Sequence, residues 1–317
     1  MMSTKALRTL VTLVVALATA GALAAEALKV IVPTAPGGGT DGYFRVLAHE
    51  AEARMGEPII IVNVPGAGGT IGVAQMVRAT DNQTVAGVWL GPVTVSPNTM
   101  KVSYTPADYI PVIQVSSAPY IACVHPDFPG NDGAGFVAEL KKNPDKYTYG
   151  NDGLGGPGHL GMARILRATG GSARDIPFKG AGETLQSFLG GHVDIYVGSI
   201  PPILPHVQQG KAKCLLVTSA ERVAAMPQAA SLKDIGIPNE ETILWRALIA
   251  PKSMPRERVA KLEAAFEKAA NSTASRKFLE DAGEQVEIRK GQALRDYIDR
   301  EYAAMGVVAR SLNLAPQ

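Results

Sequence analysis

The amino-acid sequence predicts an α/β protein whose parallel sheets are divided between two lobes. Short apolar runs alternate with helical patterns along most of the 317 residues. About 290 residues follow an N-terminal export signal, close to the size at which one core divides into two. Glycine-rich segments follow several apolar runs, where strands are expected to turn into helices. The 46% hydrophobic content is sufficient for two cores.

Residues 1–25 have the three parts of a secretory signal peptide. Lys5 and Arg8 give a basic start, Thr9 to Leu23 form an apolar-to-small stretch, and Ala22-Leu23-Ala24-Ala25 offers a cleavage site. A membrane anchor is the alternative, but the stretch is short for a span and a soluble pattern follows it at once. No Cys follows the small residues, which argues against a lipid anchor. We therefore expect export and cleavage.

The net charge argues against a nucleic-acid partner. The formal charge of +2 includes Lys5 and Arg8, the only charged residues before Glu26, so the mature chain is near zero. Binding to a polyanion needs a basic face that releases counterions, and no run of Lys or Arg approaches one.

Seven apolar runs have the length and composition of buried strands. Near-continuous apolar strands that alternate with helices predict parallel sheets covered on both faces. The runs are Leu28 to Val32, Ile59 to Val64, Thr84 to Leu90, Ile110 to Val124, Val193 to Val197, Cys214 to Thr218 and Ile243 to Ala250.

Helical spacing of apolar residues occurs between these runs and dominates the C-terminal part of the chain. We expect the C-terminal helices to pack on a lobe rather than to form a separate domain. The stripes are Phe44, Leu47, Ala48, Ala51 and Met55; Leu185, Phe188 and Leu189, ended by Gly190-Gly191; Val259, Leu262, Phe266 and Ala269; and Leu294, Tyr297, Ile298, Tyr302 and Met305.

The sequence has no long linker, so short strands must cross between the lobes. Ile110 to Val124 and Ile243 to Ala250 are the longest apolar stretches and the natural crossing points. We assign residues 26–122 and 245–317 to lobe one and residues 123–244 to lobe two. Cys123 and Cys214 each lie in a predicted strand. An exported chain could oxidise them, but we favour buried free thiols over a disulfide.

Four glycine-rich loops lie at strand ends, at residues 33–41, 65–72, 150–159 and 179–182. In open α/β sheets, ligands bind beyond the carboxyl ends of strands, where helix N-termini offer N–H donors and a positive dipole end. Glycine lets a ligand approach the backbone and permits positive φ. A single glycine only punctuates a turn, but four glycine-rich loops favour a cradle for an anion or carboxylate.

The pattern G-x-G-x-x-G occurs at 37–42 and at 153–158, which raises the alternative of dinucleotide sites. Such a site also needs an acidic residue at the end of the second strand, and that strand ends at Asn63. Short glycine patterns arise easily in a chain with 33 glycines. We therefore expect no cofactor.

Catalytic and metal-binding patterns are absent from the sequence, so we expect no metal and no enzyme activity. Ser199 lacks the second glycine of G-x-S-x-G. His159 alone among the histidines follows a glycine-rich loop, where it either donates to a carboxylate or caps the loop. Asp41 is expected to cap backbone N–H groups at a helix start, with ligand contact as the alternative. No metal spacing joins His49, His125, His159, His192 and His206.

Several motifs occur in order along the mature chain. They are Val-Pro-x-x-Pro-Gly-Gly-Gly-Thr-Asp at 32–41, Asn-x-Pro-Gly-Ala-Gly-Gly-Thr-Ile-Gly at 63–72, Val-His-Pro at 124–126, Gly-x-Gly-x-x-x-His-Leu at 153–160, Ile-Pro-Phe-Lys-Gly at 176–180, Leu-Gly-Gly-His-Val-Asp at 189–194 and Ala-Pro-x-x-x-Pro at 250–255. This order resembles the receptors of tripartite tricarboxylate transporters, also called the Bug (Bordetella uptake gene) family.

The resemblance implies a periplasmic binding protein of type II, in which two Rossmann-like lobes are joined by crossing strands and close over a solute in the interlobe cleft. It implies a small carboxylate as ligand and the small and large membrane subunits of a transporter as partners. We expect a monomer. By position, the ligand contacts are Ala35, Pro36, Gly37, Gly38, Gly39, Thr40, Asp41 and Gly91 from lobe one, and Gly153, Gly155, Gly158, His159, Lys179, Gly180, Ala181 and Asp194 from lobe two, with the role of Asp194 left open.

Two segments depart from the family pattern. Residues 80–85 replace the usual Pro-Asp-Gly-Tyr-Thr-Leu, which alters a turn, and Arg246 follows Trp245 where an apolar residue and a glycine are common. We hypothesise that Arg246 adds a bidentate contact to a second carboxylate. A surface side chain that points away from the cleft is the alternative.

The sequence therefore predicts capture of a carboxylate followed by hinge closure. A sensory receptor for a carboxylate and an exported enzyme that acts on a carboxylated substrate are the alternatives. Di- and tricarboxylates, aromatic acids and acidic amino acids all remain open as ligands.

Overall fold

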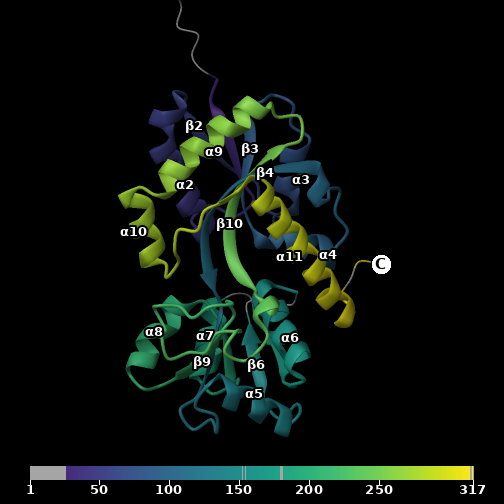
Figure 1. The fold of residues 1–317 in the computed structure, drawn as a ribbon, viewed down its shortest axis with the longest axis vertical. Helices are drawn as coiled ribbons and strands as arrows, with labels where there is room; N and C mark the ends of the chain where they lie inside the picture. Colours follow the sequence, from purple (N-terminus) through teal and green to yellow (C-terminus); the bar gives the residue numbers. More distant parts are fainter. Residues whose placement is uncertain (1–25, 152, 154, 179–180, 315, 317) are drawn as a thin grey trace, which may run out of the picture.

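The computed structural model describes residues 26–151, 153, 155–178, 181–314 and 316. They form two lobes stacked end to end, each built on one sheet (Figure 1). The predicted signal peptide, residues 1–25, lies outside the described residues. Within the described ranges, no helix combines the length and the apolar character that a membrane span requires.

Lobe one contains a six-stranded sheet with the order β11-β4-β10-β3-β1-β2. β1 pairs in parallel with β2 and β3, whereas β10 pairs antiparallel with β3 and β4. β10 therefore lies inside the sheet although it comes late in the chain. The strands are β1 (Leu28–Val32), β2 (Ile59–Asn63), β3 (Thr84–Trp89), β4 (Tyr109–Pro119), β10 (Ile243–Pro251) and β11 (Arg289–Lys290).

Helices cover both faces of this sheet, because alternate residues of its apolar strands point to opposite faces. Val30 and Leu248 belong to the core beneath α2, α9 and α10, and Ile31 and Ala247 belong to the core beneath α3 and α11. The helices are α2 (Gly39–Met55), α3 (Thr70–Val77), α4 (Ser96–Thr99), α9 (Arg256–Ala270), α10 (Thr273–Asp281) and α11 (Gly291–Ser311), with the short η1 (Ala67–Gly69), η2 (Gly91–Val95) and η3 (Pro106–Asp108).

Lobe two contains a five-stranded sheet with the order β7-β6-β8-β5-β9. β6 is parallel to β7 and β8, and β5 is antiparallel to β8 and β9. The elements are β5 (Ile121–Val124), α5 (Gly133–Lys142), β6 (Thr148–Asn151), α6 (Pro157–Thr169), β7 (Arg174–Pro177), α7 (Ala181–Leu189), β8 (Ile195–Gly198), α8 (Ile200–Gln208), β9 (Lys213–Val217) and η4 (Pro238–Glu240).

Two chain segments cross between the lobes. β4 ends at Pro119 and β5 begins at Ile121, so the apolar run at 110–124 supplies strands to both sheets. β10 returns the chain to lobe one. Because one segment enters lobe two and the other leaves it, β4 and β10 run in opposite directions. This introduces antiparallel pairs into sheets that the sequence predicted to be parallel.

Cys123 and Cys214 form a disulfide, so the expectation of free thiols is wrong. The two cysteines are 91 residues apart in the sequence, but the pairing of β5 with β9 places them opposite each other. Apolar runs located each cysteine in a buried strand and gave no information on which strands are neighbours. Disulfides persist in oxidising compartments, which agrees with the predicted export.

Candidate functional site

The carboxyl ends of the parallel strands of both sheets face the boundary between the lobes. β4 leads into lobe two, and β1, β2 and β3 run in the same direction as β4. β5 runs away from the boundary, so β8, which is antiparallel to it, runs toward the boundary together with β6 and β7. The loops and helix N-termini that follow these strands therefore meet between the lobes.

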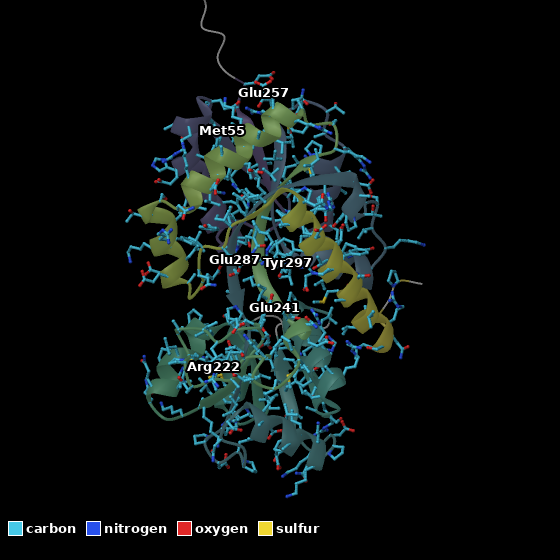
Figure 2. All side chains as sticks on the ribbon, viewed as in Figure 1. Met55, Arg222, Glu241, Glu257, Glu287 and Tyr297 are labelled. Carbon is cyan, nitrogen blue, oxygen red and sulfur yellow. A yellow bond between two sulfur atoms is a disulfide. The ribbon has the colours of Figure 1, made fainter. Side chains whose placement is uncertain are left out.

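These loops lie on one side of the crossing strands. A β-carbon added at Gly155 of lobe two would lie 3.6 Å from the side chain of Thr99 of lobe one. On the other side, β11 and the loop after β9 line a groove of about 460 Å³. Its lining includes Arg222 and Glu241 of lobe two and Glu287 of lobe one, which are labelled in Figure 2. The candidate site and this groove are thus separated by the crossing strands.

The loop before α2 presents exposed backbone at residues 35–39. Gly38 is the N-cap of α2 and has no side chain to accept hydrogen bonds from the first turn. The first N–H groups of a helix also lack partners within it. Gly37 has a φ of 88°, which favours glycine. This helix N-terminus can therefore offer N–H donors and a positive dipole end to an anion.

Asp41 lies buried beneath this loop and holds it in place. Its Oδ2 accepts hydrogen bonds from Gly37 N at 2.9 Å and Arg45 Nε at 3.0 Å, and its Oδ1 accepts one from Asn63 Nδ2 at 2.8 Å. Burial raises the pKa of the Asp41 carboxyl, but the hydrogen bonds from Arg45, Gly37 and Asn63 outweigh burial and hold that pKa below its usual value. Asp41 thus caps its own loop, as expected from its position.

The loop before α6 in lobe two is built in the same way. Gly156 is the N-cap, and Gly155, with a φ of 70°, donates its N–H to Nδ1 of His159 at 2.9 Å. Asn151 Oδ1 accepts a hydrogen bond from Gly153 N at 2.9 Å. In each lobe, therefore, the glycine two residues before the helix donates to the side chain of the third helical residue.

His159 caps its own loop, which was one of its two expected roles. Because Nδ1 accepts from Gly155, the proton of the neutral ring belongs on Nε2, which lies 3.7 Å from Asp175 Oδ2. Burial lowers the pKa of His159 more than Asp175 raises it. Burial likewise raises the pKa of Asp175, although His159 and Asn151 lower it. His159 is thus a neutral, buried anchor of the loop.

Gly91 and Gly158 lie at the same edge of their sheets but are buried. Gly91 begins η2 two residues after the end of β3, and a β-carbon there would collide with the Trp89 indole. Gly158 is the second residue of α6. Close packing therefore explains the small residue at position 91.

Arg246 is buried on β10 and points toward the start of α2, so the alternative of a surface side chain is wrong. Its Nε donates to Thr40 Oγ1 at 3.0 Å, and its Nη1 pairs with the Glu284 carboxylate. The guanidinium lies beside the candidate site, but its charge is already offset by Glu284.

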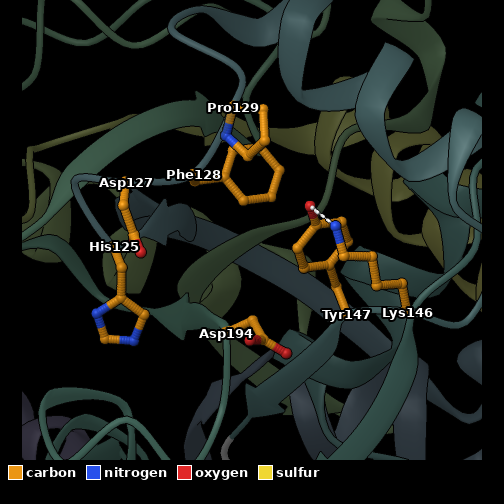
Figure 3. Close-up of a pocket in the computed structure, with 7 residues that line it drawn as sticks. All are labelled: His125, Asp127, Phe128, Pro129, Lys146, Tyr147 and Asp194. Carbon is orange, nitrogen blue, oxygen red and sulfur yellow. Dashed lines mark hydrogen bonds between the residues drawn. The ribbon is translucent and has the colours of Figure 1, made fainter.

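Asp194 lies at the opposite edge of the sheet of lobe two, and its inclusion among the ligand contacts is corrected. It precedes β8 instead of following it, and its Oδ2 accepts hydrogen bonds from Thr148 N at 2.7 Å and Thr148 Oγ1 at 2.8 Å. Asp194 lines a pocket of about 260 Å³ together with His125 and Lys146. These residues are drawn in Figure 3. The structure therefore separates Asp194 from the interlobe loops.

The second glycine-rich loop of lobe two falls partly outside the described residues, which exclude Lys179 and Gly180. Ala181 begins α7 after β7, at the site edge of the sheet. Ser199 is the N-cap of α8 at the same edge, and its side chain makes no capping hydrogen bond. Among the described residues, no group of His, Cys, Asp or Glu could hold a metal ion.

Three residues that hold the loops were missed by sequence reasoning. Asn63 ends β2 and bonds Asp41, Asn151 ends β6 and bonds Gly153, and Asp175 on β7 is paired with Asn151. In the sequence, the signal that could have identified Asn63 and Asn151 was a polar residue at the end of an apolar strand.

Residues 43–314 match the family described as "Tripartite tricarboxylate transporter family receptor", abbreviated TctC. The chain belongs to this family. A curated relative of this TctC receptor, the "UPF0065 protein in gbd 5'region" of Cupriavidus necator, is 36% identical over 245 residues, or 76% of this chain and 74% of the relative.

Solved structures share the TctC receptor fold. A TctC solute-binding protein from Polaromonas is 30% identical with a TM-score of 0.82, and the match covers 90% of this chain and 98% of that one. MatC from Rhodopseudomonas palustris, solved with bound malate, is 27% identical with a TM-score of 0.70, over 90% of this chain and 99% of MatC. The predicted family resemblance and fold class are therefore confirmed, and the structural relatives are solute-binding proteins.

Proposed function

We propose that this TctC receptor captures a small carboxylate in the periplasm and delivers it, as a monomer, to the small and large subunits of a membrane transporter. The observation that carries the proposal is the pair of similar helix N-termini, α2 in lobe one and α6 in lobe two, at facing edges of the two sheets. Both begin at a glycine N-cap without a side-chain hydrogen bond. Such termini favour anions. The malate bound to MatC makes a short dicarboxylate the first class to test.

Capture and closure follow from the position of the loops. The exposed backbone of residues 35–39 receives a carboxylate, with N–H donors from Gly38, Gly39 and Thr40. Lobe two, with the N-termini of α6 and α7, then closes over the solute, and Gly91 shapes the floor below it. Hydrogen bonds from N–H groups to a carboxylate strengthen as closure expels water. The cycle forms no covalent bond.

The buried side chains beneath the loops act indirectly in this proposal. Asp41 and His159 are both bonded to glycines of their own loops, so they fix the donors and leave the solute to the backbone. Backbone donors grip any carboxylate. Selectivity among acids must therefore come from the side chains that surround the remainder of the solute.

Titration calorimetry and thermal unfolding of the purified mature chain test the proposal. The panel contains malate, citrate, an aromatic acid and acidic amino acids, with dimethyl malate as an uncharged control. An acid at 100 times its Kd stabilises the protein by about 2.7 kcal/mol. The proposal fails if no acid of the panel raises the unfolding temperature, or if the dimethyl ester binds as tightly as malate.

A further inference from the structure

Arg246 occupies a position that no sequence pattern explains. It pairs with Trp89, the last residue of β3, and therefore lies at the edge of the sheet from which the site loops emerge. The pairing of β10 with β4 shifts register between Arg246 and Ala247. Such irregularities bend a strand locally. Arg246 thus marks the point where the returning strand leaves the junction and enters the sheet of lobe one.

The guanidinium of Arg246 is fixed from three directions. Nε donates to Thr40 Oγ1 at 3.0 Å, and Nη1 pairs with Glu284, which follows α10. Nη2 packs against the backbone of α2, since a β-carbon at Gly39 would lie 3.2 Å from it. Arg246 and Glu284 are 4% and 8% exposed, respectively, as side chains. A buried, planar group that is bonded through Nε and Nη1 has little freedom to move with a ligand.

The electrostatics also argue against a direct role toward an anion. A buried cation at the positive end of a helix is unfavourable unless a carboxylate offsets it, and Glu284 does so. A second carboxylate at Arg246 would approach Glu284 as well. The contacts that Arg246 makes are with Thr40 and Gly39, two residues of the proposed carboxylate cradle.

In lobe two, a buried arginine also bonds the returning segment, although it lies on the helix itself and two turns from its N-terminus. Arg164 of α6 is buried and donates from Nη2 to Asn239 O at 3.0 Å and from Nη1 to Thr242 Oγ1 at 3.2 Å, directly before β10. Its Nη1 also lies 3.4 Å from Glu301 of α11 in lobe one. The two helices that begin at the site, α2 and α6, are thus each bonded through one buried arginine to the same returning segment.

We propose that Arg246 is a positioning residue: it fixes the first turn of α2 to the returning strand, so that the donors of the lobe one loop are ordered before a solute arrives. This inference rests on the proposed function for the identity of the ligand, but the order of the loop can be measured without one. It replaces the hypothesis that Arg246 binds a second carboxylate.

Thr40 provides the test, because its side chain can change without removing a buried charge. Thr40→Val keeps the shape and loses the acceptor for Arg246 Nε, whereas Thr40→Ser keeps the hydroxyl. We expect Thr40→Val to weaken malate binding by about three- to tenfold, the value of one hydrogen bond. Amide hydrogen exchange in residues 37–41 should become faster in the ligand-free protein, and Thr40→Ser should restore both properties.

Thr84→Val is the matched control. Thr84 is also buried, and its Oγ1 donates to Asp81 Oδ2 at 2.8 Å, but it begins β3 at the edge far from the site. It should lower the unfolding temperature and leave affinity and loop exchange unchanged. Arg246→Lys, which keeps the charge and lacks Nε, should match Thr40→Val, and the double variant should be no weaker than either single variant.

The outcomes separate this inference from the proposed function. Unchanged exchange at residues 37–41 in Thr40→Val overturns the positioning role, whether or not the parent protein binds malate. A parent protein that binds no acid of the panel, together with faster exchange in Thr40→Val, overturns the proposed function and leaves the positioning role in place. A third outcome would instead support direct contact between Arg246 and a second carboxylate. In it, the parent protein and Thr40→Val bind malate more tightly than a monocarboxylate, and Arg246→Lys loses this preference.

Discussion

Lobe one anchors its site loop with a carboxylate, and lobe two anchors the equivalent loop with an imidazole. The backbone geometry is nearly the same: the N-caps Gly38 and Gly156 have φ and ψ of −76° and 164°, and −75° and 168°. The donors Gly37 and Gly155 both have positive φ. The geometry therefore requires an acceptor at the third helical position and does not require a charge there.

The chemistry of the two acceptors differs in its response to acid. The pKa of Asp41 is lowered by its donors, so it accepts hydrogen bonds throughout the neutral range. His159 accepts from Gly155 only while Nδ1 is unprotonated. As the pH falls, the hydrogen bond that anchors the loop of lobe two should therefore break before the one that anchors the loop of lobe one. The lobes also differ covalently, since the disulfide joins two strands of lobe two.

The largest expected difference between the lobes comes from this disulfide. Closing a loop of this length restricts the unfolded chain, so Cys123→Ala with Cys214→Ala should lose about 4 kcal/mol of unfolding free energy. Urea unfolding with and without dithiothreitol measures the effect, and the double variant should not respond to the reductant. An unchanged midpoint for the parent protein under full reduction would contradict the prediction.

Asp41→Asn should break the anchor of lobe one. The amide places an NH₂ group against either Arg45 or Asn63, which are both donors, and leaves a buried hydrogen bond unmade. We expect a loss of about 2–3 kcal/mol in unfolding free energy and weaker solute binding. Asp81→Asn, which alters the turn before β3, is the control and should leave affinity unchanged. Equal losses of affinity in both variants would show that Asp41 has no special relation to the site.

Acidification should loosen lobe two. The lowered pKa of His159 means that its contribution to stability is fully present above the ordinary value of 6.5 and is lost as the pH falls from there through the folded pKa. The raised pKa of Asp175 acts with the opposite sign, because its cost arises as the pH increases above 3.8 toward the folded pKa. Asp41 loses its contribution only below 3.8.

Calorimetry over a descending pH series should therefore show an affinity that is constant down to pH 6.5 in the parent protein. The affinity should then fall by about fivefold, the value of one hydrogen bond, as the pH passes through the lowered pKa of folded His159. His159→Asn retains an acceptor without a titrating ring and should remove the part of the pH dependence that belongs to the protein. Protonation of the ligand itself affects both proteins equally, so the role of His159 is measured by the difference between their two profiles of affinity against pH. Parallel profiles would refute the role of His159.

The smallest effects are expected at the two donor glycines. Alanine at a positive φ is strained, so Gly37→Ala and Gly155→Ala should each cost about 1 kcal/mol. No atom lies within 4 Å of the added β-carbon at Gly37, and that at Gly155 meets only ordinary contacts, so strain should dominate. Gly182 lies in α7 with open space around an added β-carbon, so Gly182→Ala should change the unfolding free energy by no more than about 0.5 kcal/mol. Chemical denaturation can resolve these differences.

The sequence located the features that depend on local patterns. Apolar runs and helical stripes gave the lobes, and glycine-rich segments gave the loops at 35–41 and 153–159, because strand ends and turns are encoded by neighbouring residues. Pairing between distant strands is not encoded in this way. The opposition of Cys123 and Cys214, and the pairing of Arg246 with Glu284, both depend on it.

The error at Asp194 had a different cause. The residue belongs to a recognisable motif, but it stands before Ile195, the first residue of β8, and the amino ends of these strands point away from lobe one. The apolar run at 193–197 placed Asp194 inside the predicted strand, and the sequence did not show the direction of that strand. Asn63 and Asn151 were missed because polar residues at strand ends resemble ordinary turn residues.

The topology also sets an order in which the molecule can be assembled. All five strands of lobe two lie between residues 121 and 217, whereas the sheet of lobe one needs β10 at residues 243–251 between β3 and β4. A chain that emerges from a translocation channel N-terminus first can complete lobe two, with its disulfide, while lobe one still lacks an inner strand. The arrival of β10 then completes the interior of this sheet and supplies Arg246, so the proposed anchor of the loop at 35–41 forms long after the loop itself has been made.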